Sequence, residues 1–258
     1  VRKVISVVIS YCSNDEAFIQ PLLSECKKFS QDIVVVSTNH FLDGEYDLNL
    51  KDLSEPCVKH LIYPWEVDKD PKYWHNHNRF LGLQAATQDY ILFLDADEIP
   101  DGNLMKGFLE EGHHLSVPIV TFECYWYFRE PIYQAEQTER CGAIFHRGHI
   151  TEELIYHSME RWSFELTQTP YIDKARYNNQ IIMHHLSWVR TKEQMLKKVN
   201  SWAHKSDKLW VSLIHQEFEY PFKGRDFVHN YKFNEVSNIF NINIHGRQET
   251  TESNTILA

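Results

Sequence analysis

The sequence predicts an α/β fold with a mainly parallel central sheet, and three observations support this prediction. Short β-branched runs recur along the first hundred residues, and such runs are typical of strands buried on both faces of a sheet. Segments with apolar residues at helical spacing separate them. The 258 residues are 43% hydrophobic, which is enough for one substantial core. We therefore expect a single compact domain.

The first hundred residues begin with a predicted β-α-β unit. Val4 to Ile9 forms a strand that ends in a polar turn at residues 10–15. Apolar residues from Phe18 to Phe29 then recur at helical spacing, with Pro21 near enough to the helix start to be tolerated. Ile33 to Val36 is the second strand. Because the crossover is right-handed, the carboxyl ends of both strands meet at one sheet edge, where ligands of open α/β sheets bind.

Later segments continue the same alternation. A helix is expected between Trp74 and Thr87, and an unbroken apolar strand runs from Tyr90 to Leu94. Val117 to Phe122 has the composition of another strand. The stretch from Cys124 to Glu139, which is rich in aromatic and charged residues, is interpreted as strand and loop. A second, smaller set of elements thus follows the first hundred residues.

An acidic cluster follows the apolar strand. Asp95, Asp97 and Glu98 lie within four residues, and carboxylates this close raise one another's pKa unless a cation or hydrogen-bond donors compensate. Mg²⁺ or Mn²⁺ would do so, since these ions accept a few carboxylates and complete their shell with water and phosphate oxygens. The alternative interpretation is that these acids cap a helix beginning near Asp101.

The net charge and the cysteine content indicate which binding partners and which cellular compartment to expect. The chain has 26 basic and 36 acidic side chains and a net charge of -10, which argues against a nucleic-acid partner because such binding depends on neutralising phosphates. An anionic substrate therefore needs a local cation. No apolar run is long enough to span a membrane. Five widely spread cysteines without a close pair indicate a reducing compartment, so we expect a cytoplasmic protein.

The run from Arg79 to Asp97 resembles the signature of family 2 glycosyltransferases. In that signature an arginine, a glycine, an alanine and an apolar strand precede an Asp-x-Asp motif. Arg79, Gly82, Ala86 and Asp95-Ala96-Asp97 stand at the matching positions. The Asp-Ala-Asp-Glu-Ile-Pro string also occurs in the β-1,4-N-acetylglucosaminyltransferase III type family, so the resemblance leaves the exact family open.

Two further segments carry the resemblance. The first strand, with Tyr11 and Asn14, is similar to the opening nucleotide-binding strand of family 2. Residues 185–190, followed by a helix that holds Lys197 and Lys198, resemble a C-terminal segment common in bacterial and viral members. A capping box of Thr191 and Gln194 marks the start of that helix.

The chain also departs from the family pattern at two places. Residues 37–39 are Ser-Thr-Asn where the family usually has an acidic turn, and Phe80 replaces an asparagine after Arg79. The acidic turn takes part in recognising the base of the nucleotide. The resemblance therefore leaves the base open between a UDP and a GDP type of donor.

The resemblance implies the GT-A fold, a Rossmann-like fold of nucleotide-diphospho-sugar transferases. Residues 1–100 would form the nucleotide-sugar-binding part, and residues 101–258 the acceptor-binding part with the C-terminal helices. The implied reaction is metal-dependent transfer of a sugar, with inversion, to a glycan or glycoprotein acceptor. The alternatives are a nucleotidyltransferase, which usually has a glycine-rich loop where this chain has residues 11–15, and a catalytically degenerate binding module.

The same resemblance assigns donor-binding and metal-binding residues. The metal ligands would be Asp95, Asp97 and His185, with His184 as the alternative histidine, although any one of the 15 histidines is individually weak evidence. The donor-binding residues would be Tyr11, Asn14, Asn39, Arg79 and Asp95. Arg79 has a second interpretation, in which it fixes a carboxylate at the sheet edge instead of contacting the diphosphate.

An inverting transfer also requires a group that removes the proton of the acceptor hydroxyl. By resemblance Glu152 is the first candidate for this catalytic base and Glu153 is its rival. The alternative interpretation is that both are exposed acids in the first turn of a helix, where the helix dipole favours them. Candidates for stacking against acceptor sugars, or else for core packing, are Trp65, Trp74, Trp126 and Tyr127.

Overall fold

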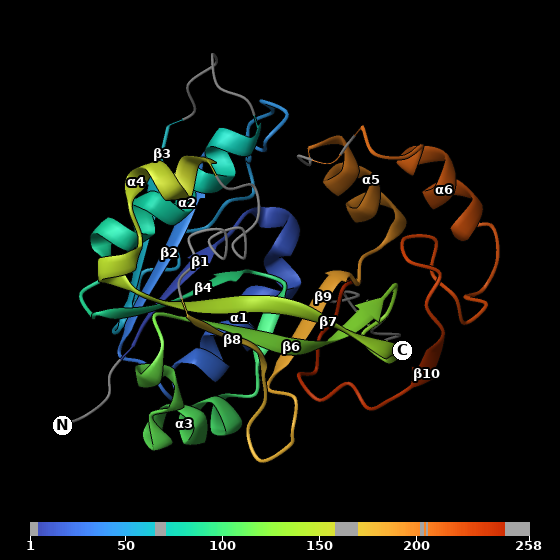
Figure 1. Cartoon of the computed structure of the whole chain (residues 1–258). Helices are drawn as coiled ribbons and strands as arrows, with labels where there is room; N and C mark the ends of the chain where they lie inside the picture. Colours follow the sequence, from blue (N-terminus) through green and yellow to red (C-terminus); the bar gives the residue numbers. More distant parts are fainter. Residues whose placement is uncertain (1–4, 65–70, 158–169, 202–203, 205, 246–258) are drawn as a thin grey trace, which may run out of the picture.

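The computed structural model describes residues 5–64, 71–157, 170–201, 204 and 206–245. Within this part of the chain ten strands form one sheet, whose main path runs in the order β3-β2-β1-β4-β7-β6-β9-β5 (Figure 1). β8 pairs with β6 and β10 pairs with β7 beside this path. The strands are β1 Ser6–Ser10, β2 Asp32–Thr38, β3 Val58–Tyr63, β4 Tyr90–Asp95, β5 Glu98–Pro100, β6 Ile119–Phe128, β7 Tyr133–His146, β8 Tyr171–Ala175, β9 Met183–Trp188 and β10 Phe233–Glu235.

The sheet is parallel in its first four strands and mixed beyond them. β1 lies between β2 and β4 and pairs with both in parallel, and β3 continues the parallel arrangement. β7 then pairs antiparallel with β4 and with β6. The predicted α/β class is confirmed, and the parallel character predicted for the sheet belongs chiefly to its N-terminal half. Both parts of the chain, before and after residue 100, contribute to this one sheet.

Helices cover both faces of the parallel half, because the apolar strands bury side chains on both sides. Val7 and Ile9 of β1 join the core cluster that contains residues of α1 and α3, whereas Val8 packs with residues of α2 on the opposite face. Figure 1 shows α2 beside α4 and, across the sheet, α3. The helices are α1 Glu16–Cys26, α2 Pro71–Ala85, α3 Gly102–Glu111, α4 Glu152–His157, α5 Lys192–Asn200 and α6 Trp210–Glu217.

Gly82 of the family 2 signature has a packing role. It lies in α2 where this helix crosses β1, and a Cβ atom placed there would come within 2.1 Å of Cγ1 of Val8. Only a residue without a side chain lets the helix approach the strand this closely. This contact positions α2, and with it Arg79, against the sheet.

Asp101 caps α3, and this settles the alternative interpretation of the acidic cluster. Its side chain accepts hydrogen bonds from the backbone N–H groups of Asn103 and Leu104. Asp95 and Asp97 lie before it, at the end of β4 and in the turn that leads to β5. The capping function therefore falls on Asp101, and the two aspartates of the Asp-x-Asp motif do not cap the helix.

The C-terminal half adds a third core cluster, which is largely aromatic. Trp126, Trp188 and Trp210 come together there from β6, β9 and α6. The predicted capping box of Thr191 and Gln194 is confirmed at the start of α5. None of the helices in the described residues combines the length and the apolar character needed to cross a membrane.

Candidate functional site

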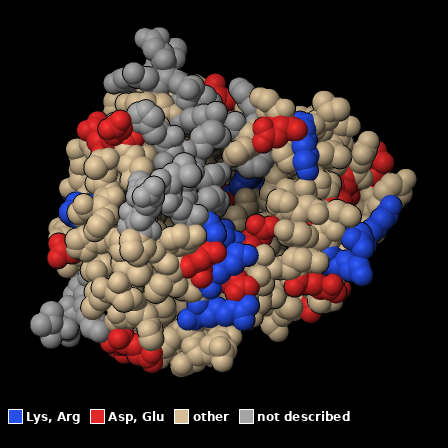
Figure 2. All heavy atoms as spheres, in the orientation of Figure 1, with Lys and Arg blue, Asp and Glu red and all other residues tan. Residues whose placement is uncertain are grey.

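A cavity of about 750 Å³ opens at the carboxyl ends of β1 and β4. Ser10 and Asp95 are partners in the register of these two strands, so the residues that follow each strand meet at this edge, as expected for an open α/β sheet. The C-terminal half forms the opposite wall with residues from β7, β9, α5 and α6. Figure 2 shows basic and acidic side chains next to one another around a hollow in the middle of this face.

Asp97 lies at the centre of a charged cluster and is only 6% exposed. Its Oδ2 accepts hydrogen bonds from Nη2 of Arg190 at 3.0 Å and from Nζ of Lys198 at 3.2 Å, and its Oδ1 lies 3.7 Å from Nε2 of His185. Although burial opposes ionisation, the charges of Lys198, Arg190 and His185 lower the pKa of Asp97 to about 2. Asp97 is therefore an ionised carboxylate held by three basic side chains.

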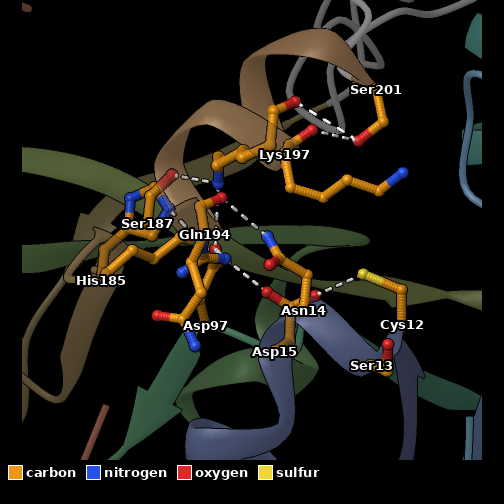
Figure 3. Close-up of polar contacts among 12 residues, drawn as sticks. Cys12, Ser13, Asn14, Asp15, Asp97, His185, Ser187, Gln194, Lys197 and Ser201 are labelled. Carbon is orange, nitrogen blue, oxygen red and sulfur yellow. Dashed lines mark hydrogen bonds and ion pairs between the residues drawn. The ribbon is translucent and has the colours of Figure 1, made fainter. Parts of the chain in front are cut away.

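Arg190 joins the two halves of the molecule at this point. Its Nη2 donates to Asp15 as well as to Asp97, and its guanidinium lies over the ring of Phe18 at 5.0 Å. Figure 3 shows Asp15 and Asn14, from the turn before α1, opposite residues of the C-terminal half. Arg190 is 2% exposed and lines the cavity, yet its Nε and Nη1 atoms have no hydrogen-bond partner among the described residues.

The two adjacent histidines of β9 have different environments. His185 lines the cavity; burial disfavours its charge, but a hydrogen bond with Cys124 and the nearby Asp97 and Glu98 raise its pKa to about 9. His184 points away from the cavity and hydrogen-bonds to the hydroxyl of Tyr127 at 2.8 Å, and burial lowers its pKa to about 4. The structure therefore brings His185, and not His184, to Asp97.

Asp95 and Arg79 interact with each other. The carboxylate of Asp95 lines the cavity, and its Oδ1 lies 3.9 Å from Nη2 of Arg79. Arg79 is 3% exposed, also contacts Asn76 and His75 of its own helix, and does not line the cavity. This geometry agrees with the interpretation in which Arg79 fixes a carboxylate at the sheet edge.

Of the other residues predicted to bind the donor, two line the cavity and one does not. Tyr11 and Asn14 line the cavity; the Tyr11 hydroxyl donates to Glu16 at 2.6 Å, and the Asn14 side chain donates to the backbone of Gln194 at 3.2 Å. Asn39 does not line the cavity, and its side-chain oxygen lies 2.6 Å from Nδ1 of His40.

Glu152 and Glu153 are not brought to the cavity. They lie exposed in the first turn of α4, which packs against α2, and neither lines the cavity. This is the position that the alternative interpretation gives them. Their role as catalytic base stays a prediction that no contact within the described residues supports.

Of the four aromatic residues predicted to stack on sugars, only Trp126 lines the cavity, and at 2% exposure it also belongs to the aromatic core cluster. Tyr127 is 5% exposed and packs against His184, and Trp74 is 1% exposed with its ring stacked on Tyr63 at 5.7 Å. For these two, core packing is the correct interpretation. Trp65 lies outside the described residues.

The predicted metal site can be tested against the donor atoms. The described residues contain no group of three or more His, Cys, Asp and Glu side chains placed to hold a metal ion. However, Oδ1 of Asp97 and Nε2 of His185 are 3.7 Å apart, which is compatible with two ligands of one ion. Mn²⁺ or Mg²⁺ commonly takes one or two protein ligands and completes its shell with phosphate oxygens and water. The described residues therefore offer two candidate ligands, Asp97 and His185, and an ion would bind there only with loss of the His185 proton.

Sequence reasoning gave no role to several residues that complete the site. Asp15, Glu139 and Arg190 line the cavity, as does Lys198. The signal for Arg190 was an arginine placed directly after the apolar strand that contains His185, a position where a buried cation needs acidic partners. No local signal marks Asp15 or Glu139, because their importance depends on contacts across the sheet.

Comparisons with known proteins give similarity of fold only. No protein-family model and no curated protein matches the chain. S. aureus TarS 1–349 in complex with UDP-GlcNAc has 14% identity and a TM-score of 0.47, covering 84% of this chain and 73% of that chain. The 2-C-methyl-D-erythritol 4-phosphate cytidylyltransferase from Thermus thermophilus has 8% identity and a TM-score of 0.43, covering 75% and 96%. At TM-scores below 0.5 these similarities carry no argument about function.

Proposed function

We propose that this chain is a glycosyltransferase of the GT-A kind, which binds a nucleoside diphosphate sugar in the cavity and transfers the sugar to a glycan or glycoprotein acceptor. The diphosphate would lie beside Asp97, Arg190 and Lys198. The proposal combines the resemblance of the Arg79 to Asp97 segment to family 2 glycosyltransferases with the charge arrangement at the carboxyl ends of β1 and β4.

The observation that carries the proposal is the state of Arg190. The guanidinium of Arg190 is buried, and its Nε and Nη1 atoms have no hydrogen-bond partner in the described residues. Buried N–H groups are normally hydrogen-bonded, so these two donors lack an acceptor. These atoms belong to a side chain that lines the cavity. Phosphate oxygens are strong, charged acceptors that such N–H donors bind well. We infer that a phosphate-type anion, bound with a small shift of this buried side chain, would supply the partner.

The rest of the cavity suits the two ends of a nucleotide sugar. Tyr11, Thr38 and Phe41 line the side next to β1 and β2, where a nucleoside would lie. Trp126 and Trp210 line the opposite side. Aromatic faces suit the C–H faces of sugar rings, so the sugar and the acceptor would lie on that side.

The chemistry assigned to the basic residues is stabilisation of the leaving group. As the bond between the sugar and the diphosphate breaks, negative charge grows on the diphosphate, and fixed cations of Arg190 and Lys198 stabilise that charge more than they stabilise the bound donor. Mn²⁺ or Mg²⁺, held by Asp97 and His185, would add Lewis-acid neutralisation of the same charge.

Binding of nucleotides to the whole chain tests the proposal. Thermal unfolding is followed with UMP, UDP, GDP and the UDP- and GDP-sugars, each with and without Mn²⁺. UDP or GDP at about 100 times its dissociation constant should stabilise the fold by about 2.7 kcal/mol. UMP has no β-phosphate, so it should stabilise the fold less than UDP does. If none of these compounds raises the unfolding temperature, the proposal is wrong.

Release of nucleotide separates the proposal from its alternatives. A glycosyltransferase releases UDP or GDP from the bound sugar nucleotide when an acceptor glycan is supplied. A nucleotidyltransferase instead releases pyrophosphate from a nucleoside triphosphate and a sugar phosphate. A degenerate module binds the nucleotide or the glycan and releases neither product.

A further inference from the structure

The second half of the cavity contains an acidic residue whose surroundings differ from those of the other acids. Glu139 lies in β7 and lines the cavity with its side chain 30% exposed. Its Oε1 accepts a hydrogen bond from the hydroxyl of Tyr231 at 2.7 Å and lies 3.8 Å from Nε2 of His229. Its Oε2 has no partner among the described residues. One carboxylate oxygen is thus anchored while the other remains available.

Most of the other acids that line the cavity are paired with a basic side chain or with backbone N–H groups. Asp15 and Asp97 share Arg190, and Asp95 pairs with Arg79. Glu98 is fully buried and accepts from the backbone N–H groups of Asp95 and Gly142. Asp207 accepts from Nδ1 of His204 at 2.9 Å. Among the described acids that line the cavity, Glu139 and Asp207 pair with no lysine or arginine and keep an oxygen without a partner. Asp207 lies between α5 and α6 with its side chain 55% exposed, whereas Glu139 is held within β7 at 30% exposure.

The strand register places Glu139 on the same face of the sheet as His185. Glu139 is the partner of Cys124, and His185 is the partner of Trp126, so both face the cavity from strands on either side of β6. The backbones of Glu139 and His185 lie two strands apart and are offset by two residues along the strand direction, which corresponds to a separation of roughly 12 Å. Both residues line the same cavity, so a sugar ring would lie between them.

The wall around Glu139 suits a carbohydrate acceptor. His229 lines the cavity with its side chain 42% exposed, and its ring lies 5.1 Å from that of Trp126, which is 2% exposed and belongs to the aromatic core. Aromatic rings of this kind pack against the apolar face of a sugar and leave its hydroxyl groups to polar neighbours. A carboxylate among them is positioned to accept a hydrogen bond from such a hydroxyl.

We propose that Glu139 is the catalytic base of the transfer, an inference that rests on the proposed function. The acceptor oxygen attacks the anomeric carbon of the donor and forms the new C–O bond. The bond from that carbon to the diphosphate oxygen breaks, and its electron pair leaves with the nucleoside diphosphate. The acceptor proton passes to Oε2 of Glu139, which later releases it to water. Glu139 thereby takes the role that the sequence resemblance gave to Glu152 or Glu153.

The test compares Glu139→Gln with the unchanged chain on one donor and one acceptor. The donor is a UDP- or GDP-sugar and the acceptor is a methyl glycoside, chosen as the combination from which the unchanged chain releases nucleotide fastest. Loss of a general base lowers kcat by about 100-fold to 10,000-fold. The affinity for UDP or GDP should stay within about threefold, since glutamine has nearly the same shape and Glu139 lies away from Arg190. Glu139→Asp keeps the carboxylate and should recover part of the lost kcat.

Two control variants separate catalysis from structure. Glu136→Gln makes the same change at an exposed position of the same strand, and kcat should not change. Tyr231→Phe removes the hydrogen bond to Oε1 and leaves the carboxylate, so it should lower kcat far less than Glu139→Gln. If Glu139 only held Tyr231 in place, both variants would lower kcat and the unfolding temperature equally, and the inference would be wrong.

Other outcomes overturn the inference in distinguishable ways. Unchanged kcat in Glu139→Gln, or a 100-fold loss in Glu152→Gln or Glu153→Gln alone, refutes the role of Glu139 and leaves the proposed function intact. If the unchanged chain binds UDP or GDP but releases no nucleotide from any sugar nucleotide with any acceptor, the proposed function fails and the inference fails with it.

Discussion

The two walls of the cavity differ in the charge that they contribute. Around Asp97, the wall built from the parallel strands supplies the acids Asp15, Asp95 and Asp97, whereas the wall built from the C-terminal half supplies His185, Arg190 and Lys198. Each wall alone would hold like charges close together in a poorly solvated place. Asp97 of the Asp-x-Asp motif is therefore stabilised by cations about ninety residues further along the chain, whereas Asp95 pairs with Arg79 of its own wall.

The largest expected effect comes from removing the charge of Asp97. Asp97→Asn leaves Arg190 and Lys198 without their shared carboxylate, and breaking a buried ion pair costs about 3 kcal/mol. At about 2–4 °C per kcal/mol the unfolding temperature should fall by roughly 6–12 °C. Turnover of the sugar nucleotide should fall at least about 100-fold, since several kcal/mol of charge stabilisation depend on this site.

The control for this variant is Asp101→Asn, at the cap of α3. Asparagine caps a helix about as well as aspartate, so α3 should remain capped and turnover should not change. If Asp97→Asn and Asp101→Asn behaved alike in nucleotide binding and in thermal unfolding, the opposite charges of the two walls would not be coupled.

The pH dependence of stability tests whether ionised Asp97 pairs with the basic wall. The pKa of Asp97 is lowered to about 2, against the pull of burial, by Lys198, Arg190 and His185, whereas an unfolded aspartate has a pKa of about 3.9. Because the folded value is the lower one, ionised Asp97 stabilises the fold in full above about pH 4, and this contribution is lost as the pH falls towards about 2. The difference in unfolding temperature between the unchanged chain and Asp97→Asn should therefore be larger at about pH 7 than at about pH 3. A constant difference would contradict the ionised pair.

The next effect concerns the phosphate contacts of Arg190. Arg190→Lys keeps a positive charge near Asp15 and Asp97 but removes the Nε and Nη1 donors. One or two hydrogen bonds to a charged group are worth about 1.5–3 kcal/mol, so affinity for UDP or GDP should fall about 10-fold to 100-fold in a calorimetric titration. Affinity for UMP should fall less. Arg225→Lys, at an exposed position, is the matched control, and equal affinity for UDP in both variants would refute the role of Arg190.

The parallel wall was predictable because its signals are local. The β-branched runs, the helical spacing between them and the turn after Leu94 each lie within a few residues, and they predicted β1, β2, β4, α1 and α2. Gly82 and the position of Asp95 and Asp97 at the sheet edge followed from the same segment. Local pattern and tertiary position agree there, since each buried strand presents its end to the edge where ligands bind.

The opposite wall was less predictable because its residues act through long-range contacts. Arg190 meets Asp15 across 175 positions of the sequence, and no periodic pattern encodes such a pair. Glu139 was included in a stretch of strand and loop, and its orientation depends on the pairing of β7 with β6. The prediction of the base at Glu152 and Glu153 relied on resemblance alone, and their position in α4 is a matter of tertiary structure.

A smaller effect is expected at Gly82, far from the charges. Gly82→Ala places a Cβ atom 2.1 Å from Cγ1 of Val8, and such overpacking typically costs about 1–3 kcal/mol. The unfolding temperature should fall by several degrees, whereas affinity for UDP should change little because the nucleotide-binding residues stay in place. Gln84→Ala, at an exposed position of the same helix, should leave both properties unchanged. A loss of affinity as large as that of Arg190→Lys would mean that helix packing controls the site.

The smallest effect is expected at the cap of α5, the helix that brings Lys198 to the acidic wall. The Thr191 side chain accepts from the backbone of Gln194, and the capping box is complete. Thr191→Ala should cost about 1 kcal/mol, seen as a fall of about 2–4 °C in the unfolding temperature, and Thr191→Ser should restore most of it. Affinity for UDP should fall less than about threefold, because Asp97 and Ser187 still hold the Lys198 ammonium. A fall in affinity beyond that of Arg190→Lys would show that fraying of α5, rather than the ion pairs, sets the position of the basic wall.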